Sequence, residues 1–380
     1  MTNINSRRAY LPLWFCFHCF AGAKTRVGQL LRLLLHLLVT VMFPLHLLLG
    51  LVLVPATATE LFKNMTMSFT CVACSLKHLV QIYHLPQMLR IEQLLQQLDA
   101  CVLHATEQRY FKQTLQLHVR CITRGVYVMY FIIYLAFALS VATLLHKQPR
   151  ELLYHAWFPF EWQRSSESYA LAFGFQICSI LFEGLQGLTN DVYTPLTLCY
   201  LGGHAHMLAM RLSRLGFDQS AEVTTDQQLL ACFEDYKLLM SLHKLAQQTI
   251  SYVQLVQLLA CGASLCIIVS YVLFYVRDVV GFIYNIIYIA VVLVQLFPSC
   301  YYASVLHEQE QRLTYAIFSS NWYEQSPLYR RRVLIFMQLT LALGKRPMRA
   351  AGLIELNLNA FFATVKMAYS LFAVIVRVKV

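Results

Sequence analysis

Long stretches of apolar residues constrain this chain more than any other feature of its sequence. Residues 125–145 contain no charged side chain, and several other stretches of similar length are almost as apolar. A helix needs roughly 20 mostly apolar residues to cross the hydrocarbon core of a membrane. Only 13% of the 380 residues are charged, whereas a typical soluble domain carries about 25%. The sequence therefore predicts an all-α membrane protein.

Seven segments are predicted as transmembrane helices. They are residues 30–54, 61–85, 125–145, 169–201, 252–275, 279–305 and 353–376. The second is the least apolar, because Lys63, Asn64 and Lys77 interrupt it. Residues 10–20 form an aromatic patch that is too short to cross a membrane and lacks a good cleavage site after it, so we predict an interfacial helix there.

Basic residues are distributed unequally between the predicted loops. If the N-terminus is inside, the inner segments carry most of the loop Lys and Arg, and the outer loops carry few. Such a bias marks the cytoplasmic side, and it accounts for the net charge of +11 without nucleic-acid binding. The sequence thus predicts a cytoplasmic N-terminus and an extracellular C-terminus.

The long inner segments have apolar residues at helical spacing and few Gly, Pro or Ser clusters, so we expect helices there that form a cytoplasmic anchor. The predicted organisation has four parts. Residues 1–29 are a cytoplasmic N-terminus with the interfacial helix, and residues 30–319 hold spans one to six, with their inner helical extensions. Residues 320–350 form an anchor helix, and residues 351–380 form the last span.

The last span carries polar and small residues on one narrow face. Their spacing is 4, 3, 4, 3 and 4 residues, at Asn359, Ala363, Lys366, Ser370, Ala373 and Arg377. Such residues within a span face protein or water, not lipid. Two interpretations remain open, a helix packed in a bundle through small residues and a helix that lines an aqueous pore. In the second, Val374 and Val378 beside this face would form a hydrophobic constriction.

An aromatic-rich segment, RELLYHAWFPFEW at residues 150–162, lies in the longest predicted outer loop. It suits either an aromatic belt at the membrane surface or a lid over a pocket in the outer half of the bundle. Tyr and Phe residues in the third, fourth and sixth spans suit core packing, and they also suit a pocket for a small, mostly apolar ligand. Asn64 begins an N-x-Thr sequence and is a candidate glycosylation site.

Motifs for enzymatic chemistry or metal binding are absent from the sequence. It contains no G-x-S-x-G, phosphate-binding loop or H-E-x-x-H pattern. The pairs Cys16/Cys19 and Cys71/Cys74 lack a second pair at zinc-site spacing, and His204 with His206 lacks further ligands. We predict no enzyme, no metal site and no cofactor.

Residues 321–337, NWYEQSPLYRRRVLIFM, and residues 346–377 are similar to the corresponding parts of insect odorant receptors. Residues 150–162 and 199–216 add to this resemblance, which extends over nearly the whole chain. It implies a subunit of a ligand-gated cation channel, in a heterotetramer with an odorant co-receptor around one pore. The implied setting is the plasma membrane of a sensory neuron dendrite, and the implied ligand is a small volatile organic molecule.

The resemblance also implies site residues. Odorant contacts are expected in the outer half of the bundle, at Thr70, Cys74, Tyr130, Phe131, Tyr134, Phe173, Ile177, Tyr284 and Tyr288. Pore or gate positions are expected at Ser370, Val374, Arg377 and Val378. Two alternatives are a gustatory receptor channel of the same superfamily and a seven-span G-protein-coupled receptor, whose orientation is opposite to the one predicted here.

Overall fold

The computed structural model describes residues 4–14, 25–55, 57–146, 150–217, 224–277 and 279–379, with the backbone alone at 58, 280, 371, 372 and 374–379. The elements are η1 (Ser6–Ala9), α2 (Arg26–Leu35), η2 (His36–Met42), α3 (Phe43–Leu53), α4 (Ala58–Tyr83), α5 (Leu85–Ala100), α6 (Ala105–Tyr110), η3 (Phe111–Leu115), α7 (Gln116–Leu145), α8 (Ser166–Ser213), α9 (Thr225–Tyr275), α10 (Val279–Phe318), α11 (Pro327–Gly344), β1 (Arg349–Ala350), β2 (Ile354–Glu355) and α12 (Leu358–Lys379). The predicted helical architecture is confirmed.

Capping side chains fix where the long helices begin. Thr57 and Glu60 form a capping box at the start of α4, in which each side chain accepts from the backbone of the other residue. Thr224 and Gln227 do the same at the start of α9. These contacts satisfy N–H groups that no carbonyl within the helix can reach.

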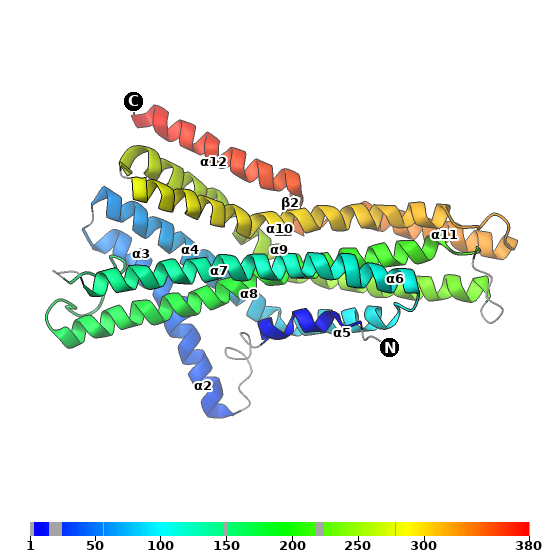
Figure 1. Ribbon diagram of the computed structural model, residues 1–380, viewed down its shortest axis with the longest axis horizontal. Coiled ribbons are helices and arrows are strands. Elements are labelled where there is room, and N and C mark those ends of the chain that lie inside the picture. The colour runs from blue at the N-terminus through cyan, green and yellow to red at the C-terminus, as the bar shows by residue number, and fades with distance from the viewer. Residues whose placement is uncertain are drawn as a thin grey trace.

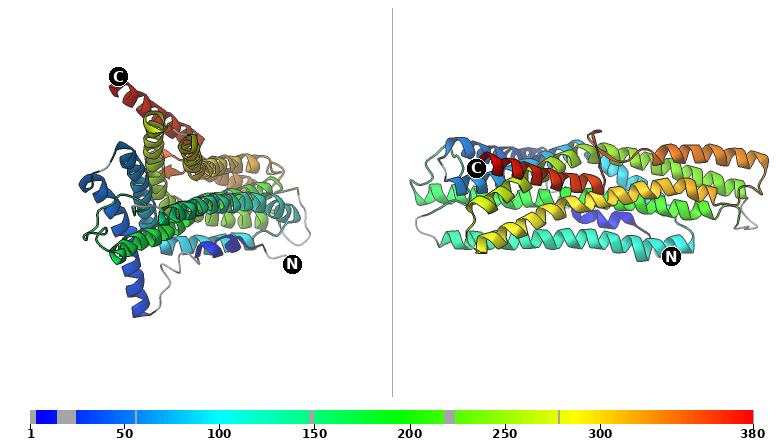
Figure 2. Two further views of the ribbon diagram at one scale, coloured as in Figure 1. Left: turned by 60° about the vertical axis from the view of Figure 1, so that its left-hand side comes forward. Right: turned by 90° about the horizontal axis from the view of Figure 1, so that it is seen from above.

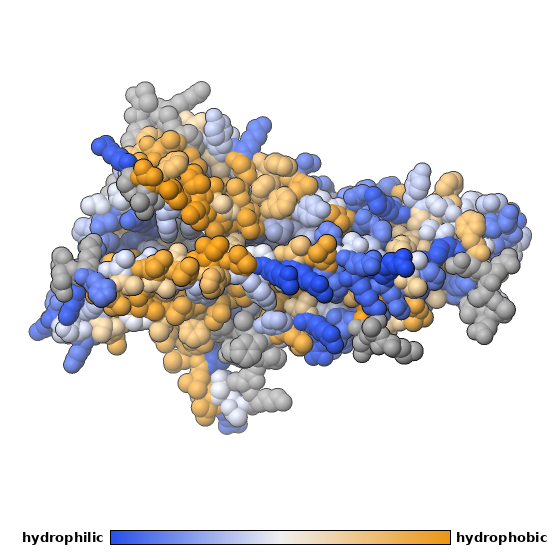
Figure 3. Space-filling view, viewed as in Figure 1, coloured by the Kyte–Doolittle hydropathy of each residue, from blue (hydrophilic) through white to orange (hydrophobic). Residues whose placement is uncertain are grey.

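Several helices are much longer than a membrane is thick. Helix α8 has 48 residues and α9 has 51, which at 1.5 Å per residue makes each more than about 70 Å long. The hydrocarbon core is roughly 30 Å thick. Figure 3 shows the consequence, since apolar residues cover much of one half of the elongated molecule and hydrophilic residues gather on the other.

The long helices run side by side along the molecule (Figures 1 and 2). Helix α8 packs along α10, and α4 packs along α9. Helix α12 lies at the edge of the bundle, where α9 and α10 are its neighbours (Figure 1).

Five helical stretches in the described part of the chain are long and apolar enough to cross a membrane. They are Arg26–Leu53, Ala105–Leu145, Ser166–Ser213, Thr225–Tyr275 and Gly281–Phe318. Helices α4 and α12 occupy the other two predicted positions, although neither belongs to this set. The chain is thus a multi-pass membrane protein in which α4 is interrupted by polar residues, as the sequence predicts.

The last helix begins later than the sequence predicts. We expected a helix from residue 353, but β1 and β2 pair as a short antiparallel hairpin, with Ala350 opposite Ile354. Ala351 and Gly352 turn the hairpin with φ of 48° and 71°, values that glycine adopts readily and other residues seldom do. Helix α12 then starts after Asn357, whose side-chain oxygen accepts from the N–H of Ala360 at 2.9 Å.

The start of the chain also differs from the predicted interfacial helix. Tyr10 and Leu13 are each only 1% exposed, and the Tyr10 hydroxyl lies 3.1 Å from Thr197 Oγ1 of α8. The Ser6 hydroxyl donates to Asp99 of α5 at 2.8 Å. Residues 6–14 therefore pack into the bundle, while residues 15–20 of the predicted helix lie outside the described residues.

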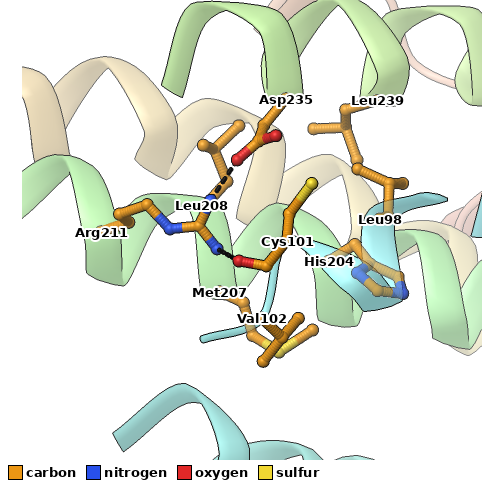
Figure 4. A pocket seen from close by; sticks show the side chains of 9 residues that line it. All are labelled: Leu98, Cys101, Val102, His204, Met207, Leu208, Arg211, Asp235 and Leu239. Atoms are coloured by element: carbon orange, nitrogen blue, oxygen red, sulfur yellow. Dashed lines mark hydrogen bonds and ion pairs between the residues drawn. The ribbon is translucent and has the colours of Figure 1, made fainter. Parts of the chain in front are cut away.

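In the hydrophilic half, one carboxylate holds two arginines at the end of α8, Arg211 within the helix and Arg214 directly after it. The Glu107 side chain is fully buried and accepts from Arg211 at 2.7 Å and from Arg214. Arg211 also pairs with Asp235 of α9 and donates to the carbonyl of Cys101 at 2.8 Å (Figure 4). This cluster joins α6, α8 and α9.

Replacing this carboxylate is expected to destabilise the protein. Glu107→Ala removes the carboxylate that two partly buried arginines share, and loss of one member of a buried pair typically costs about 3–5 kcal/mol. The measurement is the thermal unfolding midpoint of the detergent-purified protein. Glu308→Ala is the control, because its pair with Arg312 is 56% exposed on both sides and such pairs contribute below about 1 kcal/mol. Equal midpoints for the two variants would contradict this role of Glu107.

Candidate functional site

Side chains from three helices hold the backbone of the outer segment, residues 150–162. His46 Nδ1 of α3 donates to the carbonyl of Trp157 at 3.1 Å. Asn64 Nδ2 of α4 donates to the carbonyl of His155 at 2.6 Å. Gln176 of α8 donates to the carbonyl of Tyr154 at 3.0 Å and accepts from the N–H of the same residue at 3.4 Å. The segment is thereby fastened across the end of the bundle, and we call it the lid.

The lid also approaches α3 very closely. A Cβ atom added to Gly50 would lie 2.7 Å from Cα of Ala156 and 2.8 Å from the carbonyl oxygen of His155. Atoms this close must move apart, so only glycine allows the lid backbone to lie directly on α3 here.

A small apolar cluster lies beneath the lid. Its buried members are Phe43, Leu47, Cys71 and Ala156, and Tyr154 and Phe175 pack against it. Burial raises the pKa of the Tyr154 hydroxyl, and the neighbouring Tyr284 raises this pKa further. We call this group the outer cluster. It brings together residues of α3, α4, α8 and the lid, which are far apart in the sequence.

Thr70 and Tyr288 form a polar contact beside the outer cluster. The Thr70 hydroxyl lies 2.7 Å from the hydroxyl of Tyr288, which joins α4 to α10. Two hydroxyl groups next to apolar and aromatic side chains are the combination that a pocket for a small organic molecule uses to orient its ligand. Of the residues predicted to contact an odorant, these two come together most directly.

Three other predicted contact residues form hydrogen bonds with other parts of the protein. The Tyr130 hydroxyl donates to Asp191 at 2.8 Å, and the Tyr134 hydroxyl donates to the carbonyl of Leu181 at 3.0 Å. The thiol of Cys74 donates to the carbonyl of Glu183 at 3.2 Å. Each therefore ties its helix to α8.

The remaining predicted contact residues differ in position. Phe173 is buried and stacks on Tyr169 at a centroid distance of 5.4 Å, and Ile177, one turn further along α8, is half-buried. Tyr284 is 58% exposed, although it lies close enough to Tyr154 to raise the pKa of the Tyr154 hydroxyl. Phe131 is 68% exposed. It follows Tyr130 directly, so it points about 100° away around the helix from the buried face, and the structure does not bring it to the site.

Asn64 is a structural residue in this fold. Its side chain is 3% exposed, and its amide nitrogen is the atom that holds the lid at His155. Glycosylation would need this same nitrogen to be accessible, so the geometry contradicts the candidate glycosylation site.

The predicted polar face of α12 points away from the rest of the chain. Asn359, Ala363, Lys366 and Ser370 are exposed, whereas Ala360, Thr364 and Ala368 are buried on the opposite side. The Ser370 hydroxyl donates to the carbonyl of Lys366 at 3.0 Å. The side chains of Val374, Arg377 and Val378 lie outside the described residues.

Two hollows in the hydrophilic half are distinct from the outer cluster. One is a cavity of about 10 Å³ beside Arg211, His204 and Leu208 (Figure 4). This is close to the space that a single water needs, so it is too small for an odorant. The other is an open cleft of about 590 Å³ lined by Lys244, Arg346 and Arg349 among others, whose basic lining does not suit an apolar ligand.

Comparison with known proteins gives the family. The sequence pattern described as "7tm Odorant receptor" matches residues 57–369. The chain belongs to the insect odorant receptor family. Odorant receptor 33c of Drosophila melanogaster is 51% identical over 383 residues and is matched along the whole of both chains. Odorant receptor 33b of the same species is 34% identical, over 97% of this chain and 96% of the relative.

Solved structures of a distant relative share the fold of this odorant receptor. The insect olfactory receptor OR5 from Machilis hrabei has a TM-score of 0.80 at 15% identity, covering 93% of this chain and 90% of the other. The same receptor in complex with eugenol has a TM-score of 0.77 at 16% identity, covering 98% and 97% of the two chains.

Sequence reasoning missed the residues that hold the lid. His46 and Gln176 lie within segments predicted as apolar spans, and the signal that could have found them is a polar side chain in such a span. Lys77 was noticed as an interruption of its span, but its partner was not identifiable without the packing of α4 against α8 and α9.

A side chain at Gly50 is expected to loosen the lid. In an Ala156→Cys background, Gly50→Ala should raise the rate at which a membrane-impermeant maleimide labels residue 156, which is 5% exposed in the native protein. Gly174→Ala is the matched control, because nothing lies within 4 Å of a Cβ at that position. Labelling rates are compared on intact cells, with the receptor lacking the added cysteine as background. A rate that Gly50→Ala leaves unchanged would show that the lid does not rest on α3 in this way.

Proposed function

We propose that this odorant receptor is the ligand-binding subunit of a non-selective cation channel that volatile organic molecules open. Its partner is an odorant co-receptor subunit in a heterotetramer, in the plasma membrane of a sensory neuron dendrite. The observation that carries the proposal is the full-length relationship to Odorant receptor 33c. The fold shared with an olfactory receptor that is known in complex with eugenol agrees with it.

The outer cluster supports an odorant pocket beneath the lid. It combines apolar and aromatic surface with the hydroxyl pair of Thr70 and Tyr288, and it lies in the apolar half of the molecule. Phe173 and Ile177 extend it along α8. In this proposal the ligand enters beneath the lid, gains most of its affinity from apolar burial and is oriented by one hydroxyl.

The exposed face of α12 supports a pore between subunits. Within one chain α12 buries Ala360, Thr364 and Ala368 and leaves Asn359, Lys366 and Ser370 uncovered. A row of polar side chains in a span is costly against lipid, so this face needs water or another subunit beside it. A pore around which the last helices gather provides both, with Val374 and Val378 as the proposed constriction.

The two alternatives receive less support. The family pattern is that of odorant receptors, which disfavours a gustatory receptor channel; currents without the co-receptor would favour it. A G-protein-coupled receptor needs a cytoplasmic C-terminus. An epitope tag placed there should be labelled on intact cells if the proposed orientation holds.

Removing either hydroxyl of the Thr70–Tyr288 contact is expected to change odorant potency. Thr70→Val and Tyr288→Phe each remove one hydroxyl, and loss of its hydrogen bond to the ligand, worth about 0.5–1.5 kcal/mol, should shift the half-maximal concentration roughly 2- to 12-fold. The measurement is whole-cell current in cells that express the receptor with a co-receptor, over an odour panel. Thr143→Val is the control, since among the described residues that hydroxyl bonds within its own helix, to the carbonyl of Ser140. No response in the wild type would defeat the proposed function, and unchanged potency in both variants would exclude these hydroxyls from the site.

Cysteines along α12 are expected to report the pore. Single cysteines at Ser370, Val374, Arg377 and Val378 should react with a water-borne thiol reagent during odorant stimulation, and the current should change as they do. A cysteine at Ala368, which is 4% exposed against the bundle, should react much more slowly. If Ala368→Cys reacts first and the four pore positions stay inert, α12 does not line the conducting path.

A further inference from the structure

A buried ion pair lies inside the helix bundle. Lys77 of α4 places its ammonium 2.8 Å from Oδ1 of Asp191 on α8, and it also donates to Oε1 of Gln257 on α9 at 2.6 Å. The Lys77 side chain is 7% exposed and that of Asp191 is 3% exposed. Charged residues in this setting are costly and mark functional positions.

The same carboxylate reaches a fourth helix. Asp191 Oδ2 accepts from the Tyr130 hydroxyl of α7 at 2.8 Å. Both oxygens of the carboxylate are therefore used, and the network joins α4, α7, α8 and α9 at one level. Nearer the lid, Ser75 of α4 donates to Glu183 of α8 at 2.7 Å, which fastens α4 to α8 at a further point.

The network joins the helix that carries Thr70 to a helix that packs against α12. Along α4, Lys77 is seven residues from Thr70, which corresponds to roughly 10 Å. Along α9, Gln257 is five residues from Gly262, or about 7.5 Å. A Cβ at Gly262 would meet Met367 of α12 at 2.7 Å and Thr364 at 3.6 Å. Helix α4 thus connects Thr70 to Lys77, the hydrogen bond from Lys77 reaches Gln257 of α9, and α9 packs against the last helix.

The buried charges make the connection between α4, α8 and α9 rigid. In a low-dielectric interior the attraction between opposite charges is strong, and separating them leaves each charge without solvation. An ordinary apolar contact allows helices to slide by small steps, whereas this network holds α4, α8 and α9 together or breaks outright. A displacement of α4 therefore reaches α9 as a movement of the whole unit.

We propose that Lys77, Asp191 and Gln257 are positioning residues that couple odorant binding at the outer cluster to the movement of α12. The proposal rests on the proposed function, because it needs a ligand that shifts α4 and a pore that α12 lines. It assigns to Tyr130 a place in the coupling network and not a contact with the odorant.

The decisive variant replaces the pair by apolar residues of similar size. Lys77→Met/Asp191→Leu removes both charges, and such replacements of a buried pair are often neutral or stabilising, so the receptor is expected to reach the cell surface. The half-maximal odorant concentration, the spontaneous current and the surface amount are measured together, in cells that also express the co-receptor. We expect at least a tenfold shift in half-maximal concentration, or a severalfold change in spontaneous current, at a normal surface amount.

A second variant and a control keep the test decisive. Gln257→Leu leaves the ion pair intact and removes only the link to α9, so it should shift the half-maximal odorant concentration or the spontaneous current. If the double variant fails to reach the surface, Gln257→Leu decides the outcome. Lys237→Met/Glu234→Leu is the control, because this pair is exposed and lies within one helix.

The outcomes separate the two proposals. A wild-type receptor that gives no odorant current with the co-receptor defeats the proposed function. The coupling role is overturned if the wild-type receptor responds but the variants behave like it. In that outcome, potency and spontaneous current are unchanged in Gln257→Leu and in any double variant that reaches the surface. A surface amount that falls while potency and spontaneous current stay the same marks the network as structural only and equally overturns it.

Discussion

Every polar group that enters the apolar half of this molecule must find a partner there, because the hydrocarbon offers none. The helices meet this demand for their own backbones. The lid, residues 150–162, is not helical and covers the end of the same half, so its N–H and carbonyl groups need partners from elsewhere. For Tyr154, His155 and Trp157, these partners are Gln176 of α8, Asn64 of α4 and His46 of α3. These polar side chains explain how an irregular segment rests on an apolar bundle, and they fix the outer cluster beneath it.

The same demand accounts for the position of α12. Its small residues Ala360, Thr364 and Ala368 fit against the bundle, which leaves its polar residues on the far side. A single chain cannot complete the surroundings of that face. Two interpretations of its spacing were open from the sequence, bundle packing and pore lining. Within one chain the small residues pack inward and the row predicted from the spacing stays uncovered, so pore lining remains the proposal for that row.

Helix positions were largely predictable from the sequence, because an apolar run of fixed length is a local property. The start of α12 was not, since the hairpin at residues 349–355 depends on a turn with positive φ at Ala351 and Gly352. Site residues were harder still. Tyr130 and Phe131 are adjacent and both aromatic, yet one is buried on Asp191 and the other is exposed. Their difference arises from how α7 is rotated against α8, which composition and spacing within one span do not encode. Asn64 failed as a glycosylation site for a similar reason, since its partner is a carbonyl 91 residues away.

Helix α4 shows why the least apolar span is the most informative one. Three of its polar side chains, Asn64, Thr70 and Lys77, are six and seven residues apart, and each one reaches a different neighbour. Asn64 holds the lid, Thr70 meets Tyr288 of α10, and Lys77 meets Asp191 and Gln257. A more apolar α4 would cross the membrane at lower cost, but it would then lose its polar connection to the lid, to α10 and to α9. The hydropathy deficit that makes α4 a poor span is therefore the same chemistry that connects the outer cluster to the rest of the receptor.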